Sequence, residues 1–380
     1  MKAVAVFPRT RELKLIDVEE PRIDRPSDVK VRMLEVGICG TDKEICRFEY
    51  GTPPEGSDHL IIGHESLGEV VEVGPAVTDL KAGDLVVTMV RRPCPHLECR
   101  PCRAGHQDFC STGDFTERGI KGRHGFMAEY IVDEAEYMHV VAPACRDVGV
   151  LVEPLTIATK ALTQALKVLQ RLPWFDPDQL DTVHQFRQVG MRGGKHYNAL
   201  VLGAGAVGLL GAMALRTVGF DTFVYDRHPA PNPKSQLVES IGAHYIGEES
   251  LQEFEHLIGD IALVYEATGA SQLAFRAVKV LAPNSIFIFT GVPSLGAASE
   301  LDTDIIMRNA VLYNQVIMGT VNAGTEAFAL AIRGLGISMA LWPSAAESLI
   351  TGRYPLQSYR ELLLGPARGI KNVLSFTAMP

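Results

Sequence analysis

The stretch Val201–Gly208, with the sequence VLGAGAVG, decides the fold of this chain. It follows an apolar run and opens an apolar helix, as the Gly-x-Gly-x-x-Gly fingerprint of a dinucleotide site requires. The first glycine permits a tight turn, the second lets the backbone approach a pyrophosphate, and the third lets helix and strand pack closely. The helix N-terminus adds amide donors and partial positive charge. The expected cofactor contacts, with a mere tight turn as the alternative, are Gly203, Gly205, Ala206, Val207 and Gly208.

A second apolar run, Thr222–Tyr225, ends at Asp226, close to the ~20-residue spacing expected for the acid that binds the adenosine ribose. The charge of Asp226 repels a 2′-phosphate and favours NAD. Arg227 attracts such a phosphate, and the two effects, each on the order of a few kcal/mol, nearly cancel. We expect NAD to be preferred and NADP to be tolerated.

Apolar strands, glycine turns and amphipathic helices alternate from Asn198 onward, which predicts repeated βαβ units and a parallel sheet. Residues 157–169 are expected to be helical, and 171–196, which show no clear period, to be a loop or an insertion. Six parallel strands make a complete dinucleotide fold. Their predicted positions are Ala199–Leu202, Thr222–Tyr225, His244–Ile246, Ala262–Glu266, Ser285–Phe289 and Asn314–Met318.

The first 145 residues differ, with short β-like runs separated by Gly, Pro and Asp turns. These runs are Val29–Val36, Ser66–Val73, Leu85–Val90 and Ala128–Val132. A chain of 380 residues exceeds the size at which one core stops growing, so we expect two domains. We assign residues 1–156 and 321–380 to a β-rich domain, and 157–320 to the dinucleotide domain, with 157–197 as a boundary helix and loop.

Composition narrows the class of partner. A net charge of −9 without a basic cluster disfavours nucleic-acid binding, and no apolar window reaches the length of a membrane span. The N-terminus resembles a first strand rather than a signal peptide, so seven cysteines point to a reducing compartment. We expect a cytoplasmic protein with small-molecule partners.

Four cysteines lie within 17 residues, in the pattern Cys94-x4-Cys99-x2-Cys102-x7-Cys110. Clustered thiols in a proline- and glycine-rich loop predict a tetrahedral zinc site with no open position, hence a structural one. Reduced surface thiols or disulfides are the alternative. His96 lies inside the first spacing and could replace Cys94 as a ligand.

Further metal ligands stand at glycine-rich turns, in Cys39-Gly40-Thr41-Asp42 and Gly63-His64-Glu65, with Glu153 as a third candidate. A lone cysteine is usually buried packing and a lone histidine a satisfied polar residue, so these residues alone leave a second metal site about as plausible as its absence. His64 and Glu65 can both reach one ion only if the backbone bends at Gly63, because neighbours on a strand face opposite ways.

Taken together, these motifs resemble those of the zinc-containing medium-chain dehydrogenases, and within them the glucose 1-dehydrogenase branch. The similarity spans nearly the whole chain and is weakest over 161–198. The segments that carry it are Val36–Asp42, Gly63–Val70, Arg91-Arg92, the cysteine lobe, Gly113–Ile120, Gly125–Met127, Glu153–Leu155, the glycine turn and Gly319–Asn322.

The resemblance implies an α/β protein in which a GroES-like β-rich catalytic domain flanks a Rossmann domain with a doubly wound parallel sheet, the active site lying in the cleft between them. It implies that Cys39 and His64 ligate a catalytic zinc, with Glu65 and Glu153 completing or exchanging in its shell. Zinc polarises the substrate hydroxyl and Thr41 relays its proton.

For the substrate, the resemblance points to Thr41, Glu117, Glu153 and Asn322, the last also near the cofactor. For Glu117 the alternative is ordinary surface chemistry. Three departures from the family pattern stand out. The Cys94–Cys99 spacing is two residues longer than usual, some relatives have glutamine at position 153, and Asp226 differs from the NADP-preferring members.

The predicted reaction is oxidation of the C1 hydroxyl of an aldose such as glucose to the lactone by NAD(P), in a homodimer or homotetramer. A polyol, threonine or simple alcohol dehydrogenase shares the same chemistry, and only pocket polarity separates these activities. A catalytically silent NAD-binding sensor or scaffold is the alternative from another class.

Overall fold

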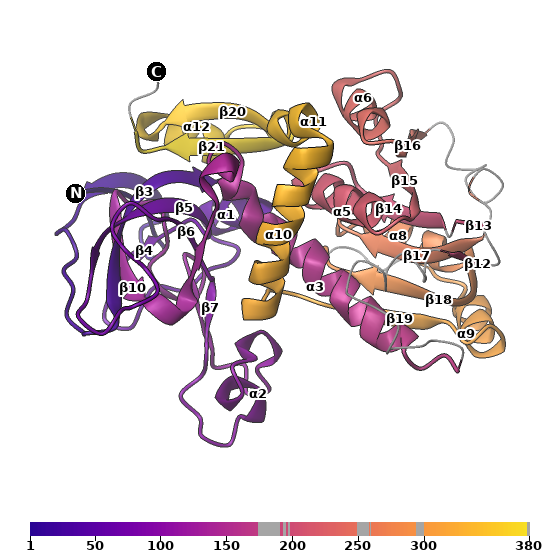
Figure 1. Cartoon of the computed structure of the whole chain (residues 1–380), viewed down its shortest axis with the longest axis horizontal. Helices are drawn as coiled ribbons and strands as arrows, with labels where there is room; N and C mark the ends of the chain where they lie inside the picture. Colours follow the sequence, from indigo (N-terminus) through magenta and orange to yellow (C-terminus); the bar gives the residue numbers. More distant parts are fainter. Residues whose placement is uncertain are drawn as a thin grey trace. The chain divides into compact units, whose positions relative to one another are not determined.

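The structure is a computed structural model that describes residues 1–173, 191–192, 195–196, 198–248, 258, 260–293 and 300–377. The chain forms two compact units. Unit 1 comprises 1–156, 322–336 and 349–380, and unit 2 comprises 157–321 and 337–348. Each has its own sheets (Figure 1), so each is described by itself.

The main sheet of unit 1 joins both ends of the chain. Its long central strand, β3, buries nearly every residue, and β21 from the C-terminal region pairs antiparallel with it. A second strand, β10, also pairs with β3. The strands in order are β11 (Met138–Val140), β6 (Leu85–Thr88), β5 (Glu65–Val73), β3 (Asp28–Gly37), β21 (Lys371–Ser375) and β20 (Ile350–Pro355), with β10 (Tyr130–Glu134) off this path.

Two small sheets complete the β structure of unit 1. One has the order β2 (Glu12–Asp17), β1 (Lys2–Phe7) and β4 (Leu60–Ile61), and the other β7 (Arg91–Arg92), β8 (Thr116–Arg118) and β9 (Gly122–Arg123). The helices are short because Gly and Pro interrupt the apolar pattern. They are α1 (Gly40–Cys46), α2 (Arg100–Arg103), α12 (Tyr359–Leu364) and the 3₁₀ turns η1 (Gln107–Phe109), η2 (Ala135–Tyr137), η3 (Pro143–Cys145), η4 (Gly149–Leu151) and η7 (Leu356–Ser358).

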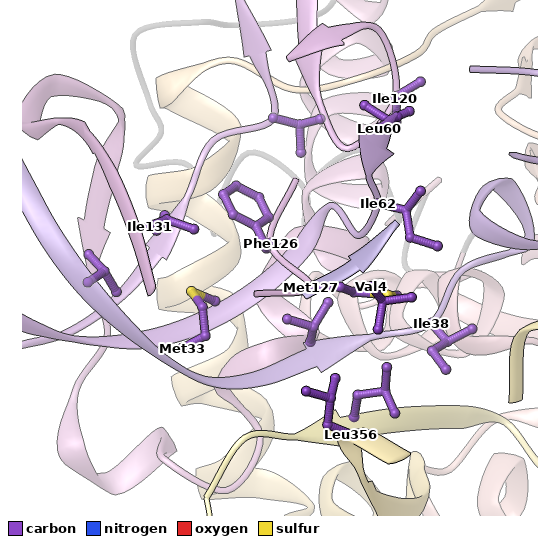
Figure 2. Close-up of a cluster of buried hydrophobic side chains, with 14 of the residues drawn as sticks. Val4, Met33, Ile38, Leu60, Ile62, Ile120, Phe126, Met127, Ile131 and Leu356 are labelled. Carbon is purple, nitrogen blue, oxygen red and sulfur yellow. The ribbon is translucent and has the colours of Figure 1, made fainter. Parts of the chain in front are cut away.

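The core of unit 1 gathers apolar side chains from distant parts of the sequence. Val4, Met33 and Phe126 are almost fully buried, and Leu356 joins them from the C-terminal region (Figure 2). Burying a side chain of this size contributes roughly 1.5–3 kcal/mol. This shared core holds the C-terminal strands against the N-terminal ones.

Unit 2 contains the predicted six-stranded parallel sheet. All six strands lie within four residues of their predicted bounds, and the sheet reverses direction of growth at its first strand, as in a Rossmann fold. The α/β fold class is therefore confirmed. The order is β16 (His244–Ile246), β15 (Asp221–Tyr225), β14 (Asn198–Leu202), β17 (Ile261–Glu266), β18 (Leu281–Phe289) and β19 (Val316–Gly319).

The predicted helix over 157–169 begins earlier than expected, as α3 (Val152–Leu169). Pro154 conceals this start, although a helix tolerates proline in its first turn. Most of the loop expected over 171–196 lies outside the described residues, and within it β12 (Met191–Arg192) pairs with β13 (Lys195–His196). The other helices are α5 (Ala206–Thr217), α6 (Pro233–Ser240), α8 (Ser271–Val278), α9 (Thr303–Leu312), α10 (Thr325–Leu341) and α11 (Pro343–Ser348). In the described part of the chain, none of the helices has the length and apolarity needed to cross a membrane.

Candidate functional site

The glycine turn of unit 2 gives each glycine a distinct steric reason. Gly203 follows β14 with φ +106, a conformation that side chains rarely adopt. A Cβ on Gly205 would meet nothing within 4 Å, so the backbone there is open to a ligand. A Cβ on Gly208 would lie 1.8 Å from the carbonyl oxygen of Gly203, so helix and turn touch. Ala206 and Val207 open α5, whose N-terminal amides face this turn.

Asp226 follows β15 and is nearly buried. Lys234 Nζ on α6 donates to its Oδ2 at 2.9 Å, and His228 contacts its Oδ1. Burial raises the pKa of Asp226, but the Lys234 and His228 hydrogen bonds outweigh it and lower the pKa overall. Arg227, expected to offset this charge, is exposed; the adjacent positive group is Lys234. Sequence spacing gave no sign of Lys234, because α6 brings it back from eight residues away.

The four cysteines of the lobe, around α2 and η1, come together in unit 1. Their sulfur atoms all lie within 4.8 Å of one another. Cys99 and Cys110 Sγ are 3.9 Å apart, which excludes a disulfide of about 2.05 Å. The separation matches the roughly 3.8 Å between two thiolates bound tetrahedrally at 2.3 Å to one zinc.

His96 does not take the place of Cys94. Its Nε2 contacts Asp114 Oδ2 at 2.8 Å, and Cys94 completes the sulfur cluster instead. Ser111 and backbone donors lower the pKa of Cys99 to about 5, which favours the thiolate form that binds metal. Four soft donors fill a tetrahedral shell and leave no open coordination position, which fits a structural zinc.

A second cluster joins Cys39, His64 and Glu65, whose ligand atoms lie within 4.8 Å of one another. Cys39 caps α1, and Glu65 begins β5. The required bend is present at Gly63, where φ is +93 and a Cβ would meet Met127 at 2.6 Å. Sulfur and nitrogen donors that leave coordination positions free fit a catalytic zinc.

The Asp42 carboxylate lies beside the imidazole of His64. Its Oδ2 accepts from the Cys39 amide at 2.8 Å, and its Oδ1 lies 3.2 Å from His64 Nδ1. Burial lowers the pKa of His64, but the Asp42 carboxylate and the Cys39 thiol outweigh it, so the pKa is well above its usual value. A carboxylate behind a ligating histidine fixes the ring and its tautomer. The sequence held one sign of this role for Asp42, which is its position three residues after Cys39, the residue that caps α1.

Glu65 is paired with a residue that sequence reasoning missed. Lys371 Nζ, from β21, donates to both carboxylate oxygens at 2.7 Å and to the carbonyl of Ile38 at 3.2 Å. Burial lowers the pKa of Lys371, but Glu65 outweighs it and raises the pKa overall. Glu65 is thus held by a buried cation while its carboxylate belongs to the cluster with Cys39 and His64. No sequence signal links residues 306 positions apart.

Glu153, the second residue of α3, is buried but does not belong to the group within 4.8 Å. Burial raises its pKa to about 7, although His64 opposes this and Glu65 adds to it. Thr41, the second residue of α1, is half-buried. A carboxyl that titrates near neutrality can exchange protons at physiological pH.

The structure brings Glu117 and Asn322 together, 205 positions apart in the sequence. Asn322 Nδ2 donates to Glu117 Oε1 at 3.0 Å, and Arg91 donates to the same oxygen through Nε at 3.1 Å and Nη2 at 3.0 Å. Asn322 has φ +58, a strained conformation typical of functional sites. The sequence alone did not indicate a role for Arg91. Its side chain reaches Glu117 because the two residues lie opposite each other on the paired strands β7 and β8.

Comparisons with known proteins agree with this geometry. The family described as "Alcohol dehydrogenase GroES-like domain" matches residues 25–143, and "Glucose dehydrogenase C-terminus" matches residues 186–376. The chain is 36% identical over 381 residues to a glucose 1-dehydrogenase of Methanocella arvoryzae, covering 100% of both. It is 37% identical to a glucose 1-dehydrogenase of Thermoproteus tenax, covering 98% of this chain and 99% of the relative.

Among solved structures, the fold matches a Haloferax mediterranei glucose dehydrogenase in complex with NADP, Zn and gluconolactone. The TM-score is 0.85 at 30% identity, with 100% of both chains covered. A Thermotoga maritima alcohol dehydrogenase matches with a TM-score of 0.78 at 22% identity and shows the shared fold alone. The predicted family, with its GroES-like and Rossmann parts, is confirmed.

Proposed function

Because the chain belongs to the zinc-containing medium-chain dehydrogenases of the glucose dehydrogenase type, we propose that it oxidises the C1 hydroxyl of an aldose such as glucose to the lactone and reduces NAD or NADP. The observation that carries the proposal is the convergence of Cys39 and His64 on one point within unit 1. The same unit holds the Glu117–Asn322 pair, whose polar groups suit sugar hydroxyls.

We assign the catalytic zinc to Cys39 and His64, with Glu65 and Glu153 at its border, and the structural zinc to the four lobe cysteines. A zinc ion held there would polarise the substrate hydroxyl and lower its pKa, and a bound nicotinamide would accept the hydride. The nucleotide phosphates would bind at Gly203, Gly205 and the N-terminus of α5, where Gly205 leaves the backbone open. Asn322, which also borders the sugar contact, is a further cofactor candidate.

The chain's own residues then divide the remaining work. The Asp42 carboxylate lies 3.2 Å from Nδ1 of His64, so Nε2 would be the nitrogen that binds the metal. Lys371 holds both carboxylate oxygens of Glu65 in place. Thr41 accepts and relays the substrate proton, and Glu153, with its pKa near 7, exchanges a proton or binds a sugar hydroxyl. Glu117 accepts a hydrogen bond from the sugar.

For the nucleotide, the carboxylate of Asp226 can accept from ribose hydroxyls, which favours NAD. Lys234 partly neutralises this carboxylate, and its positive charge would attract a 2′-phosphate. We therefore propose that both cofactors are used, with NAD preferred.

A substrate panel tests the activity. We expect purified protein with about two zinc ions per chain to oxidise an aldose faster than any polyol, threonine or simple alcohol, with NAD and with NADP. Faster turnover of an open-chain alcohol would reject the sugar assignment. Binding of NAD without turnover of any compound would support a silent binding protein instead.

We also propose that the protein is a cytoplasmic homo-oligomer. All seven cysteines are free, which suits a reducing compartment.

In the described sheet of unit 2, β19 pairs only with β18, and the adjoining α9 leaves Met307 and Val311 about 70% exposed. Such an edge favours pairing with a second copy. Light scattering should give a dimer or tetramer, and Val311→Glu should reduce its size; a monomeric wild-type protein would reject the proposal.

A further inference from the structure

The short strands β7 and β8 present two different sets of side chains. Arg91 lies opposite Glu117, and these two residues pair with each other. Because successive side chains on a strand face opposite ways, Arg92 and Arg118 turn to the other side. The strands therefore carry the candidate sugar contact on one side and two arginines on the other.

A single buried carboxylate, Asp133 on β10, binds both of those arginines. Arg92 Nη2 and Arg118 Nε donate to its Oδ2, the latter at 2.8 Å. The Asp133 side chain is fully buried, and those of Arg92 and Arg118 are nearly so. Its other oxygen accepts from the Glu134 amide at 3.0 Å.

The two arginines also tie down the surrounding backbone. Arg118 Nη1 donates to the His124 carbonyl and Nη2 to the Val132 carbonyl, while Arg92 Nη1 donates to the Met89 carbonyl. Burial raises the pKa of Asp133, but the two arginines outweigh it and lower the pKa to about 2, so the carboxylate stays charged. β10 in turn is paired along its length with β3 of the main sheet. Asp133 with Arg92 and Arg118, here called the Asp133 clamp, thus connects the small sheet that contains β7 and β8 to the main sheet of unit 1.

On the other side, the Glu117 carboxylate is fixed in one orientation. Its Oε1 receives all three hydrogen bonds from Arg91 and Asn322. In the described part of the chain no residue donates to Oε2, so this oxygen remains for a substrate hydroxyl. A contact of this kind depends on position, since a displacement of 1 Å at a binding group can cost on the order of 100-fold in rate.

We infer that Asp133 is a positioning residue for Glu117. It holds Arg118, which follows Glu117, and Arg92, which follows Arg91, the partner of Glu117. This inference rests on the proposed sugar contact of Glu117. Asp133 touches neither substrate nor cofactor; it acts by fixing β7 and β8. Its loss should therefore weaken sugar recognition specifically.

A double-mutant cycle on the zinc-loaded full chain tests the inference. We expect Asp133→Asn to raise the KM for glucose about tenfold, with the KM for NAD or NADP and the zinc content unchanged. Glu117→Gln should raise the glucose KM as well. Because Asp133 is inferred to act through the Glu117 carboxylate, the KM for glucose of the double variant should be no higher than that of Glu117→Gln alone. Calorimetric binding of gluconolactone provides the same comparison without turnover.

Glu35→Gln is the matched control. Glu35 on β3 is equally buried in unit 1 and accepts from Arg353 Nε at 2.9 Å, but neither residue belongs to β7 or β8. We expect this variant to lose thermal stability as Asp133→Asn does and to keep the glucose KM of the wild type. If Asp133→Asn does not fold, Arg118→Lys retains the charge, loses the fork of donors and undergoes the same cycle.

Three outcomes would overturn the inference. An unchanged glucose KM in Asp133→Asn, beside a raised one in Glu117→Gln, would reject the positioning role alone. Additive effects of the two substitutions would show that Asp133 acts only on stability. An unchanged glucose KM in Glu117→Gln would reject the sugar contact, and the inference with it, while the dehydrogenase activity would remain to be judged by the substrate panel.

Discussion

The two units hold their candidate sites in opposite ways. In unit 2 the nucleotide turn is one continuous stretch, and its geometry depends on glycines that lack a Cβ. In unit 1 the site assembles side chains from position 39 to position 371, and it depends on buried ions that neutralise one another. A site made of backbone is sensitive to added volume, whereas one made of side chains is sensitive to lost charge.

The ion pairs around the site of unit 1 are buried, so the loss of one partner should lower the stability of the protein. Lys371–Glu65 and the Asp133 clamp are almost fully removed from water. Removing one partner of such a pair leaves an unpaired buried charge and costs about 3–5 kcal/mol. The buried ion pairs of unit 1 therefore fix the arrangement of its donors but make the unit sensitive to the loss of one charge. The predictions below compare this sensitivity with that of the glycine turn in unit 2.

The largest effect is expected at Cys39. Cys39→Ser removes the sulfur donor of the cluster formed by Cys39, His64 and Glu65. We expect kcat to fall more than the 10–100-fold that is typical when a residue hydrogen-bonded to a metal ligand is mutated. Steady-state kinetics and metal analysis should show lost activity and about one zinc fewer per chain. Cys145→Ser, which changes a buried thiol outside both clusters, should retain activity. Full activity in Cys39→Ser would exclude its role as a ligand.

Next come the glycines of unit 2. Gly208→Ala places a Cβ against the Gly203 carbonyl and should destabilise the protein by about 1–3 kcal/mol through overpacking. Gly205→Ala fills open space at φ −87 and should leave stability within about 0.5 kcal/mol. It should nevertheless weaken nucleotide binding about tenfold, because the Cβ occupies the approach of the pyrophosphate. Chemical denaturation and NADH titration measure the two effects. Equal nucleotide affinity in Gly205→Ala and wild type would contradict the assignment.

Acid should destabilise unit 1 around two buried histidines. Burial lowers the pKa of His124 and of His139 to about 4, below the value of about 6.5 in an unfolded chain. Between these values the unfolded state binds more protons, so stability present above pH 6.5 is lost as the pH falls toward 4. The unit 2 histidines with described side chains, His228 and His244, are exposed. Hydrogen exchange at pH 7 and pH 5 should show faster opening around His124 and His139 at the lower pH.

A substitution isolates this acid effect. His139 stacks on Phe328, so His139→Phe should preserve the ring contact and flatten the fall of Tm with pH. His244→Phe, at an exposed histidine that stacks on Phe223, should leave the slope as it is in the wild type. Identical slopes for His139→Phe and wild type would rule out His139 as the source.

The smallest effect concerns the choice of nucleotide. Asp226→Ser removes the charge that repels a 2′-phosphate and frees Lys234 to attract one. The ratio of kcat/KM for NADP to that for NAD should rise about tenfold, a modest change because Lys234 already offsets part of the Asp226 charge. Lys234→Met should lower the same ratio. A ratio that does not change in Asp226→Ser would mean that this acid does not discriminate the nucleotides.

Short-range patterns in the sequence were sufficient for much of the protein. The glycine turn and the cysteine lobe are local, since each is complete within 17 residues, and their chemistry follows from spacing and residue type. The six parallel strands were also predicted, because apolar runs between glycine turns need no distant information. The helix start hidden by Pro154 shows where even a local pattern fails.

Only the tertiary structure determined which charges are paired. Lys371 behind Glu65, Lys234 rather than Arg227 beside Asp226, and Asp133 behind Arg92 and Arg118 leave no trace in sequence spacing. The physical reason is that local backbone preferences act over a few residues, whereas an ion pair is decided by which side chains the folded core excludes from water together.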